Sequence, residues 1–439
     1  MKRVWMFVVY IVILTLILLG CGQNTQQAQQ DITTNEQTPA TSEGSDEPEP
    51  EPESESEETG EVIELTVWHY FNPEYDGTAF AEVVEDFNAS QNKYHVTQEF
   101  IPREELLKQY SIGLVGDVLP DVGMVDNPEH AAFSAMGLFE DITEQVEGWE
   151  ETEQFFEGPL LSTVYEGKYY GLPHNSNCLA LWYDEDMLKE AGVDVPQTWD
   201  ELMEAAKKLT KDGVYGLAIS AVKNEEGVFQ FLPWLLSAGA DVETLDSPDA
   251  VKALTYITDM VKEGYMSNEI INWTQADVQK QFATGKAAMM INGPWNIETT
   301  KRDAPDKNWH VAKIPKDVKY SSVLGGENFG IINGKDVDGG WEFLKYICGR
   351  VGSEKFNKDT GKFPPRKDIL ESSDHWKSDP VLSVFGEQME YAMPRGPHPK
   401  WPEISTAISE AMHESITGVK TPEQALKDAQ VKAQEALKE

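Results

Sequence analysis

The segment from Lys168 to Asp184 constrains the fold more than any other part of the sequence. It starts as a short strand, breaks around Pro173, exposes a polar run and then resumes as a strand. Proline has no backbone N–H to donate to a sheet, so one uninterrupted central strand is disfavoured. Two strand pieces joined by polar residues suit a chain that leaves one compact lobe and enters another, although an ordinary surface loop shows the same pattern. If the chain crosses here, Asn175 and Asn177 lie where two lobes face each other, a usual place for a ligand.

The first residues have the pattern of an export signal. Lys2 and Arg3 precede an apolar run from Val4 to Leu19, which ends in Gly20 and Cys21. This order is typical of a signal peptide, here residues 1–21, that is removed on export. The Leu-Leu-Gly-Cys ending resembles the bacterial lipobox, in which the cysteine is acylated and becomes the new N-terminus. An uncleaved anchor helix is the alternative, and both place the chain at the outer face of the cell membrane.

Residues 22–61 are predicted to be a disordered acidic linker. They contain twelve Asp and Glu and no Lys or Arg, which leaves most of the net charge of −40 on the remainder of the chain. Its second half, from Ser45 to Glu55, has no apolar residue able to seed a core, and its prolines and like charges keep it extended. The acidic folded part disfavours nucleic acid and anionic lipid as partners, and it argues mildly against a free anionic substrate.

Strand and helix alternate after the linker, in a chain long enough for two domains. Strands and helices are expected in turn over residues 64–69, 78–88, 94–101, 104–115 and 121–125. This alternation is typical of a parallel sheet covered by helices on both faces. Ligands of such sheets bind off the carboxyl ends of the strands, which directs attention to Tyr70 and to the segment from Asp126 to Glu129.

The alternation restarts in the second half of the chain. Thr198 and Glu201 form a capping box that opens a helix, and a buried strand over residues 287–292 leads to Gly293-Pro294-Trp295. The glycine-rich segment from Gly325 to Gly330 lies between two apolar strand pieces and predicts a second crossing. Further helices are expected over residues 227–238, 248–263, 339–349, 380–389, 402–416 and 421–437. Residues 353–376 are expected to be irregular.

The cysteines and histidines give no sign of a metal site. Beyond the lipobox, only Cys178 and Cys348 remain, far apart in the sequence, and two buried thiols are a safer expectation than a disulfide. His69, His174 and His398 could be grouped as metal ligands, but three scattered histidines rarely form a site. We therefore expect no metal and no cofactor.

Catalytic motifs are also missing from the sequence. It has no glycine-rich phosphate cradle and no Gly-x-Ser-x-Gly motif. A glycoside hydrolase needs two carboxylates that face one bond, and although Asp126 and Glu327 could be paired, no spacing singles them out. We expect no catalytic residues and no enzyme.

Aromatic and polar side chains near the predicted strand ends point to a sugar. Sugar rings have apolar faces edged by hydroxyls, so their sites combine flat aromatic side chains with carboxylates, amides and arginine. The candidate ligand-binding aromatics are Tyr70, Trp234, Trp295 and Trp401. Core packing is the alternative for each, and for Trp234 the two interpretations are nearly level. The polar candidates, any of which could instead be a cap or a solvated surface group, are Asp126, Glu129, Asn175, Asn177, Glu327, Asn328 and Arg395.

Taken together, the motifs resemble the extracellular solute-binding proteins that feed ABC importers, on the maltodextrin- and multiple-sugar-binding branch. The similarity covers about residues 62–439. It rests on Leu119-Pro120-Asp121-Val122, Gly137–Ile142, Tyr170-Gly171-Leu172-Pro173, Leu181–Asp184, Pro196–Leu202, Phe282–Met289, Asn292–Trp295, Met393-Pro394-Arg395 and Pro399–Pro402.

The resemblance implies a two-lobed α/β fold of the type II periplasmic-binding-protein class, whose lobes close on a ligand. Residues 62–173 and 326–378 are expected to form the N-terminal lobe, and residues 174–325 and 379–439 the C-terminal lobe. Trp295 and Trp401 match the family's stacking aromatics. Asn127-Pro128 stands where maltodextrin binders often have a charged pair.

The function implied is that of a lipoprotein anchored through Cys21, which captures a sugar, and more specifically an oligosaccharide, and delivers it to the permease subunits of an ABC importer. A monomer is the family expectation. An importer receptor for a non-sugar solute, such as a polyol phosphate or a chelated metal, is the first alternative, although phosphate would need more cations than Arg395 alone. A secreted glycan-acting enzyme is the second.

Overall fold

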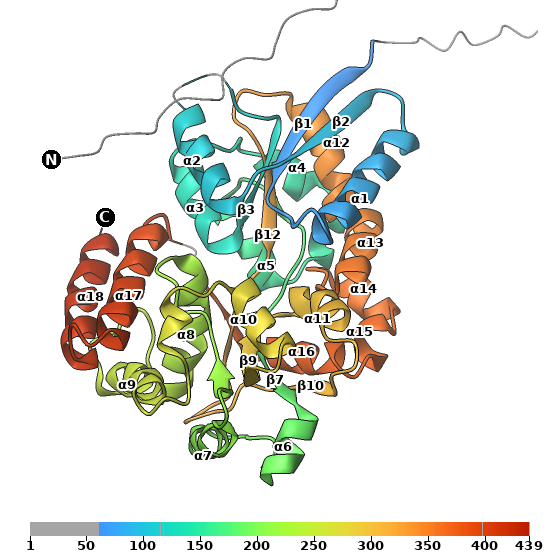
Figure 1. Cartoon of the computed structure of the whole chain (residues 1–439). Coiled ribbons are helices and arrows are strands. Elements are labelled where there is room, and N and C mark those ends of the chain that lie inside the picture. Colours follow the sequence, from blue (N-terminus) through green and yellow to red (C-terminus); the bar gives the residue numbers. More distant parts are fainter. Residues whose placement is uncertain (1–60, 115, 117, 397, 439) are drawn as a thin grey trace, which may run out of the picture. The chain divides into compact units, whose positions relative to one another are not determined.

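The computed structural model describes residues 61–438, except 115, 117 and 397. The predicted signal peptide, Cys21 and nearly all of the predicted linker lie outside the described residues. The described chain is an α/β fold with two main sheets, each flanked by helices (Figure 1). None of its helices is both long and apolar enough to span a membrane.

The first sheet has the strand order β2-β1-β3-β12-β6 in the described part of the chain. Its strands are β1 (Ile63–His69), β2 (Tyr94–Phe100), β3 (Val122–Asp126), β6 (Leu172–Pro173) and β12 (Glu327–Ile331). As predicted, β1 runs parallel to β2 and β3. The prediction of a wholly parallel sheet is wrong, because β12 is antiparallel to both β3 and β6. The cause is that β12 enters the sheet at the edge where β3 ends, so that Glu327 pairs with Asp126.

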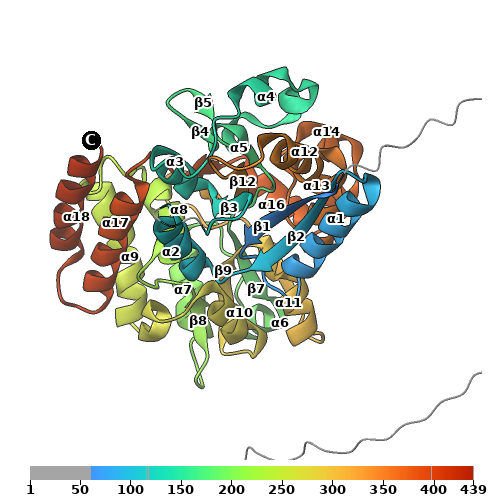
Figure 2. The ribbon, with the colours of Figure 1, turned by 90° about the horizontal axis from the view of Figure 1, so that it is seen from above.

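Helices cover both faces of this sheet (Figure 2). One face carries α1 (Asp76–Ser90), α12 (Val337–Cys348) and α13 (Arg350–Thr360), and the other carries α2 (Arg103–Gly113) and α3 (Asn127–Ala135). The buried side of α1 has apolar side chains at helical spacing from Phe80 to Phe87, as the sequence predicts. We call this sheet and its helices the N-terminal lobe.

The segment predicted to be irregular instead contains α13, α14 (Lys367–Ser372) and α15 (His375–Ser378). The buried face of α13 is made of Gly352, Ser353, Phe356, Asn357 and Thr360. It therefore has one large apolar side chain where an amphipathic helix usually has several, and the apolar period gives no signal. Gly352 is needed at the contact with α12, because a Cβ there would lie 2.5 Å from the Tyr346 carbonyl oxygen.

The second sheet has the order β10-β7-β9-β8 among the described residues. Its strands are β7 (Ala180–Asp184), β8 (Tyr215–Ala218), β9 (Ala287–Asn292) and β10 (Trp309–Ala312). Strand β9 is parallel to β8 and antiparallel to β7, so this sheet is mixed too. We call this sheet and the elements packed with it the C-terminal lobe.

Most of the remaining helices belong to the C-terminal lobe. They are α6 (Glu185–Ala191), α7 (Trp199–Leu209), α8 (Glu225–Ala238), α9 (Pro248–Lys262), α10 (Gln275–Ala283), α11 (Ile297–Asp303), α16 (Leu382–Met389), α17 (Trp401–Ile416) and α18 (Pro422–Ala436). The predicted capping box is confirmed, because the side chains of Thr198 and Glu201 each accept the other's backbone N–H at the start of α7.

The remaining α-helices and strands of the described chain are short. They are α4 (Thr143–Gly148), α5 (Glu157–Leu161), the hairpin of β4 (Val164–Tyr165) and β5 (Lys168–Tyr169), and the pair of β11 (Ser322–Leu324) and β13 (Ala392–Pro394).

The chain passes between the two sheets where the sequence predicts it. Pro173 belongs to β6 of the first sheet and Ala180 to β7 of the second, which confirms the first crossing. The predicted second crossing lies at Gly325, between β11 and β12. The backbones of Asn177 and Gly325 exchange two hydrogen bonds of 2.9 Å, so the two crossings lie side by side.

A third segment joins these crossings and was not predicted. The backbones of Ser176 and Phe363 exchange hydrogen bonds of 2.7 and 3.0 Å. Beyond this point Phe363, Ile369 and Trp376 pack in one apolar cluster with Trp182 of β7. The lobe ranges remain a prediction, but these contacts favour a return of the chain to the C-terminal lobe near Phe363 rather than after residue 378.

The two described cysteines are free thiols, as predicted. Cys178 and Cys348 are both fully buried, in different apolar clusters. Burial raises the pKa of both thiols well above the usual range, because the thiolate would lose its hydration.

Candidate functional site

Three predicted site residues meet at one edge of the five-stranded sheet. Tyr70 follows β1, Asp126 ends β3 and Glu327 begins β12, directly opposite Asp126. The pKa of the Tyr70 phenol is raised by burial and, next, by the charges of Glu327 and Asp126. The phenol and the two carboxylates therefore face the same space, at the carboxyl ends of β1 and β3 as expected for an α/β sheet.

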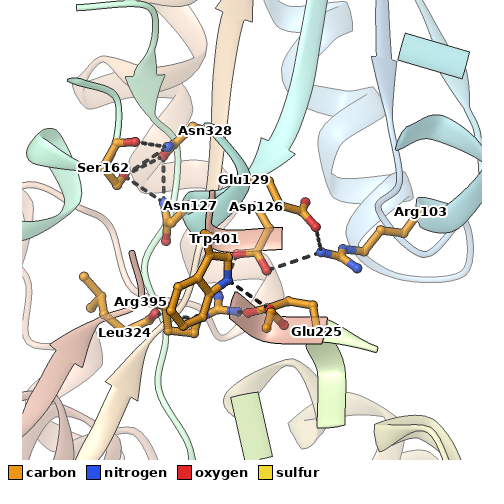
Figure 3. Close-up of polar contacts among 11 residues, drawn as sticks. Arg103, Asp126, Asn127, Glu129, Ser162, Glu225, Leu324, Asn328, Arg395 and Trp401 are labelled. Atoms are coloured by element: carbon orange, nitrogen blue, oxygen red, sulfur yellow. Dashed lines mark hydrogen bonds and ion pairs between the residues drawn. The ribbon is translucent and has the colours of Figure 1, made fainter. Parts of the chain in front are cut away.

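Arg395 links this edge to the C-terminal lobe (Figure 3). Its guanidinium donates to Asp126 Oδ1 at 2.8 Å and to Glu225 Oε1, at the start of α8, at 2.6 Å. The Arg395 Nε also donates to the Leu324 carbonyl oxygen at 3.2 Å, and the guanidinium lies 4.2 Å from the centre of the Phe229 ring. With only 3% of its side chain exposed, Arg395 is a buried, fully engaged cation between the lobes.

Trp401 lies next to the ion pair of Arg395 and Glu225. Its ring is 2% exposed, and its indole N–H donates to Glu225 Oε2 at 3.0 Å (Figure 3). The Ser405 hydroxyl donates to the same carboxylate oxygen. Trp401 thus fixes the Glu225 carboxylate that holds Arg395, and its ring packs in the core of the C-terminal lobe.

A second arginine binds the predicted Glu129. Arg103, the first residue of α2, forms an ion pair with the Glu129 carboxylate and lies 3.8 Å from that of Asp126. Glu129 lies in the first turn of α3. Burial raises the pKa of Glu129 from 4.5 to about 7, although Arg103 opposes the rise by stabilising the charged form.

Asn328 and Asn127 form a buried amide network inside the N-terminal lobe (Figure 3). The Asn127 Nδ2 donates to Asn328 Oδ1 at 2.7 Å and to the Ser162 hydroxyl at 3.1 Å, and Asn328 Nδ2 donates to the same hydroxyl at 2.9 Å. These bonds hold β12 against α3, and they engage the Asn328 amide within the lobe.

Asn175 and Asn177 lie in the first crossing and are buried. A Cβ at Gly325 would lie 2.3 Å from Asn177 Oδ1, and one at Gly326 would lie 2.3 Å from the Asn175 carbonyl oxygen. Gly326 also has a φ of +142°, which only glycine adopts readily. The glycines of the second crossing are therefore needed for the two polar residues of the first to come this close.

Trp295 provides an aromatic side chain on the C-terminal lobe. It follows β9, and its ring folds back over Gly293, where a Cβ would lie 2.0 Å from the ring. The Trp295 and Phe229 ring centres are 6.1 Å apart. Trp295 also lines a cavity of about 240 Å³ together with Tyr75 and Asp76 of the N-terminal lobe. Because Arg395 lies over the Phe229 ring and binds Asp126, the two rings lie next to the sheet edge that carries Asp126.

Trp234 is not brought to the other candidates. It is fully buried in α8, in the core of the C-terminal lobe, with ring centres of Trp199 and Tyr256 5.7 and 5.6 Å away. Its surroundings are those of a core tryptophan, the alternative that the sequence left level with stacking.

Four residues of the site were not among the sequence candidates: Arg103, Glu225, Phe229 and Lys362. Arg103 follows the carboxyl end of β2, and Glu225 follows β8 at the next helix, so the strand-end rule applied to every strand would have found both. Lys362 pairs with Asp76 at 2.5 Å, in the third crossing, and no local signal identifies it.

Comparisons with known proteins identify the family of this chain. The chain belongs to the bacterial extracellular solute-binding proteins, whose family model matches residues 82–383. The maltotriose-binding protein of Pyrococcus abyssi is 25% identical over 399 residues, which is 85% of this chain and 83% of that protein. Members of the family are binding proteins that face the outside of the cell.

Two solved structures show the same fold. An ABC transporter solute-binding protein from Thermotoga lettingae, bound with alpha-D-tagatose, matches with a TM-score of 0.80 and 27% identity, over 86% of this chain and 100% of that chain. The GacH receptor of Streptomyces glaucescens, solved with acarbose, matches with a TM-score of 0.78 and 25% identity, over 87% and 100%. The fold is thus that of two-lobed solute-binding proteins, as the sequence predicts.

Proposed function

We propose that this protein is the substrate-binding component of an ABC importer and that it captures a sugar, more specifically an oligosaccharide, between its two lobes. The observation that carries the proposal is the pair of rings of Trp295 and Phe229 on one lobe, linked through Arg395 to Asp126, the strand partner of Glu327, on the other. Aromatic faces suit the apolar side of a sugar ring, and carboxylates accept hydrogen bonds from its hydroxyls. The sugar-binding relatives support the same conclusion.

In this proposal, Trp295 stacks on a sugar ring, and Tyr70, Asp126, Glu327 and Asn175 contact its hydroxyls. Ligand binding selects the closed arrangement of the lobes, which the permease subunits recognise. Asn177, Glu129, Asn328, Arg395 and Trp401, in contrast, act mainly by fixing the walls, since their side chains are engaged within the protein or buried at the crossing.

We also propose that the protein works as a monomer held at the cell membrane by a lipid on Cys21, with residues 22–61 as the tether. A Cys21→Ser variant should then move from the membrane fraction to the medium or the soluble fraction. Retention of that variant in the membrane would favour an uncleaved anchor helix.

The test is a titration of intrinsic tryptophan fluorescence with a panel of mono- and oligosaccharides, polyol phosphates and chelated metals. A sugar should give a saturable change, and Trp295→Ala should weaken its binding by about 1–3 kcal/mol, from the size of a buried aromatic contact. Gly293→Ala should weaken it too, because the new Cβ displaces the Trp295 ring without removing it.

Trp341→Ala is the matched control, since this half-buried ring lies on α12 against Trp149, among the apolar residues of the N-terminal lobe. It should leave sugar affinity unchanged. A response to phosphates or metals alone would refute the proposal in favour of a non-sugar receptor, and product formation from a glycan would favour an enzyme.

A further inference from the structure

The charged groups between the lobes do not balance, and the excess is negative. We propose, resting on the sugar-binding function above, that the site selects sugars that carry a protonated amine over their neutral counterparts and rejects anionic sugars.

Every cation of the site described above is already paired with a carboxylate. Arg395 binds Asp126 and Glu225, at 2.8 and 2.6 Å. Arg103 binds Glu129. Lys362 binds Asp76 at 2.5 Å, with 3% of the lysine side chain exposed. An anionic ligand would have to displace one of these carboxylates, so the site provides no cation for a phosphate or a uronate.

Two carboxylates remain without a cation. In the part of the chain that the structure describes, Glu226 in the first turn of α8 and Glu327 have no Lys or Arg nitrogen within 4.0 Å, although the Gln275 backbone N–H donates to Glu226 Oε1. The Oε2 atoms of Glu327 and Glu129 are buried and accept no hydrogen bond within the protein. Glu129 is only 7% exposed, so an ionised and unpaired oxygen there is costly. Burial also raises the pKa of Glu226 and Glu327, which favours their neutral forms unless a positively charged group lies beside them.

The cavity beside Trp295 is lined by carboxylates, and no Lys or Arg is among its described lining residues. Four of these carboxylates (Glu74, Asp76, Glu82 and Glu298) are paired with cations outside the lining, and Asp359 adds a carboxylate to the lining. A cation is also favoured over the face of an indole ring, because the ring's π electrons are negative there. The face of the Trp295 ring therefore suits both the apolar side of a sugar and an ammonium group carried on that side.

An ammonium group meets these demands better than a hydroxyl. An ammonium group has three N–H donors and a positive charge, whereas a hydroxyl has one O–H donor and no charge. Hydrogen bonds between charged partners are about twice as strong as neutral ones. We expect a sugar with a free amine to bind at least about tenfold more tightly than the same sugar with that amine acetylated.

The experiment is isothermal titration calorimetry of the full-length protein with matched pairs of ligands. Each pair is an oligosaccharide of glucosamine, galactosamine or mannosamine and its N-acetylated form of equal length, at a pH where the free amine is protonated. Glucuronate oligosaccharides are the anionic probe and should not bind. The preference for the amine should shrink in high salt, because the attraction is electrostatic.

The ratio of the two affinities is the diagnostic quantity for variants. Glu327→Gln and Glu226→Gln should each reduce this ratio several-fold, since each removes an uncompensated charge. Glu342→Gln, on the exposed side of α12 where Glu342 pairs with Lys345, is the matched control and should leave the ratio unchanged. Circular dichroism and thermal melting establish that each variant is folded.

The outcomes separate this inference from the proposed function. If neutral and amine-bearing sugars bind equally, or if the ratio is unchanged in both glutamate variants, the inference is wrong and sugar capture stands. If no sugar gives a binding signal, both this inference and the proposed sugar-binding function are wrong. Binding of glucuronate oligosaccharides would also overturn the inference.

Discussion

Replacement of Arg395 should destabilise the protein more than replacement of any exposed arginine. Arg395→Met keeps most of the side-chain volume and removes the charge, so that the carboxylates of Asp126 and Glu225 face each other without a cation. Breaking a buried ion pair by removing one partner typically costs about 3–5 kcal/mol. Because 3% of the Arg395 side chain is exposed and both of its carboxylate partners are bound at 2.8 Å or less, we expect a loss in this range.

The assay is urea denaturation followed by tryptophan fluorescence, which gives the free energy of unfolding. The matched control is Arg302→Met. Arg302 of α11 also bridges to the N-terminal lobe, at 3.0 Å from Glu74, but the two side chains are 49% and 70% exposed, and such pairs contribute about 0–1 kcal/mol. Adding Asp126→Asn to Arg395→Met should recover part of the loss. A loss below about 1 kcal/mol in Arg395→Met would refute the view of Arg395 as a buried tie between the lobes.

Three further predictions follow from burial. The folded protein holds the proton of Glu129 up to about pH 7, whereas the unfolded chain releases it near pH 4.5. The free energy of unfolding of the wild type should therefore fall relative to that of Glu129→Gln as the pH rises between these values, because the stabilising effect of the protonated form is lost. Parallel curves of unfolding free energy against pH would contradict the raised pKa of Glu129. Trp234→Ala should lower the unfolding free energy by about 3–5 kcal/mol, as for other buried aromatic side chains, whereas an unchanged urea midpoint would show that the ring is not a core residue. Cys178 and Cys348 should react with Ellman's reagent only after unfolding, because both are fully buried with raised thiol pKa values; rapid reaction of the native protein would contradict their burial.

Much of the fold could be predicted because its signals are local. The apolar spacing from Phe80 to Phe87 and the capping box at Thr198 each involve residues within one or two turns of a helix. Strand pieces around Pro173 predicted the first crossing for the same reason. The antiparallel entry of β12 and the third crossing at Phe363 depend on which segments meet in space, and no local pattern records that.

The site could be predicted as a set of positions but not as a set of partners. Asp126 and Arg395 both stood among the candidates, yet they are 269 residues apart, and only the fold shows that they bind each other. Trp401 was a stacking candidate because it lies at the end of a predicted element and matches the family's late aromatic. The fold instead packs its ring in the core of the C-terminal lobe, where its indole N–H donates to Glu225 at the start of α8.

The place of β12 between β3 and β6 has a consequence for how the chain is made. The ribosome completes all four strands of the second sheet before it reaches Glu327, so the first sheet stays split until late in translation. Contacts between such distant segments also form slowly, because a long loop must close first. The N-terminal lobe can therefore complete its sheet only after every strand of the second sheet has been made.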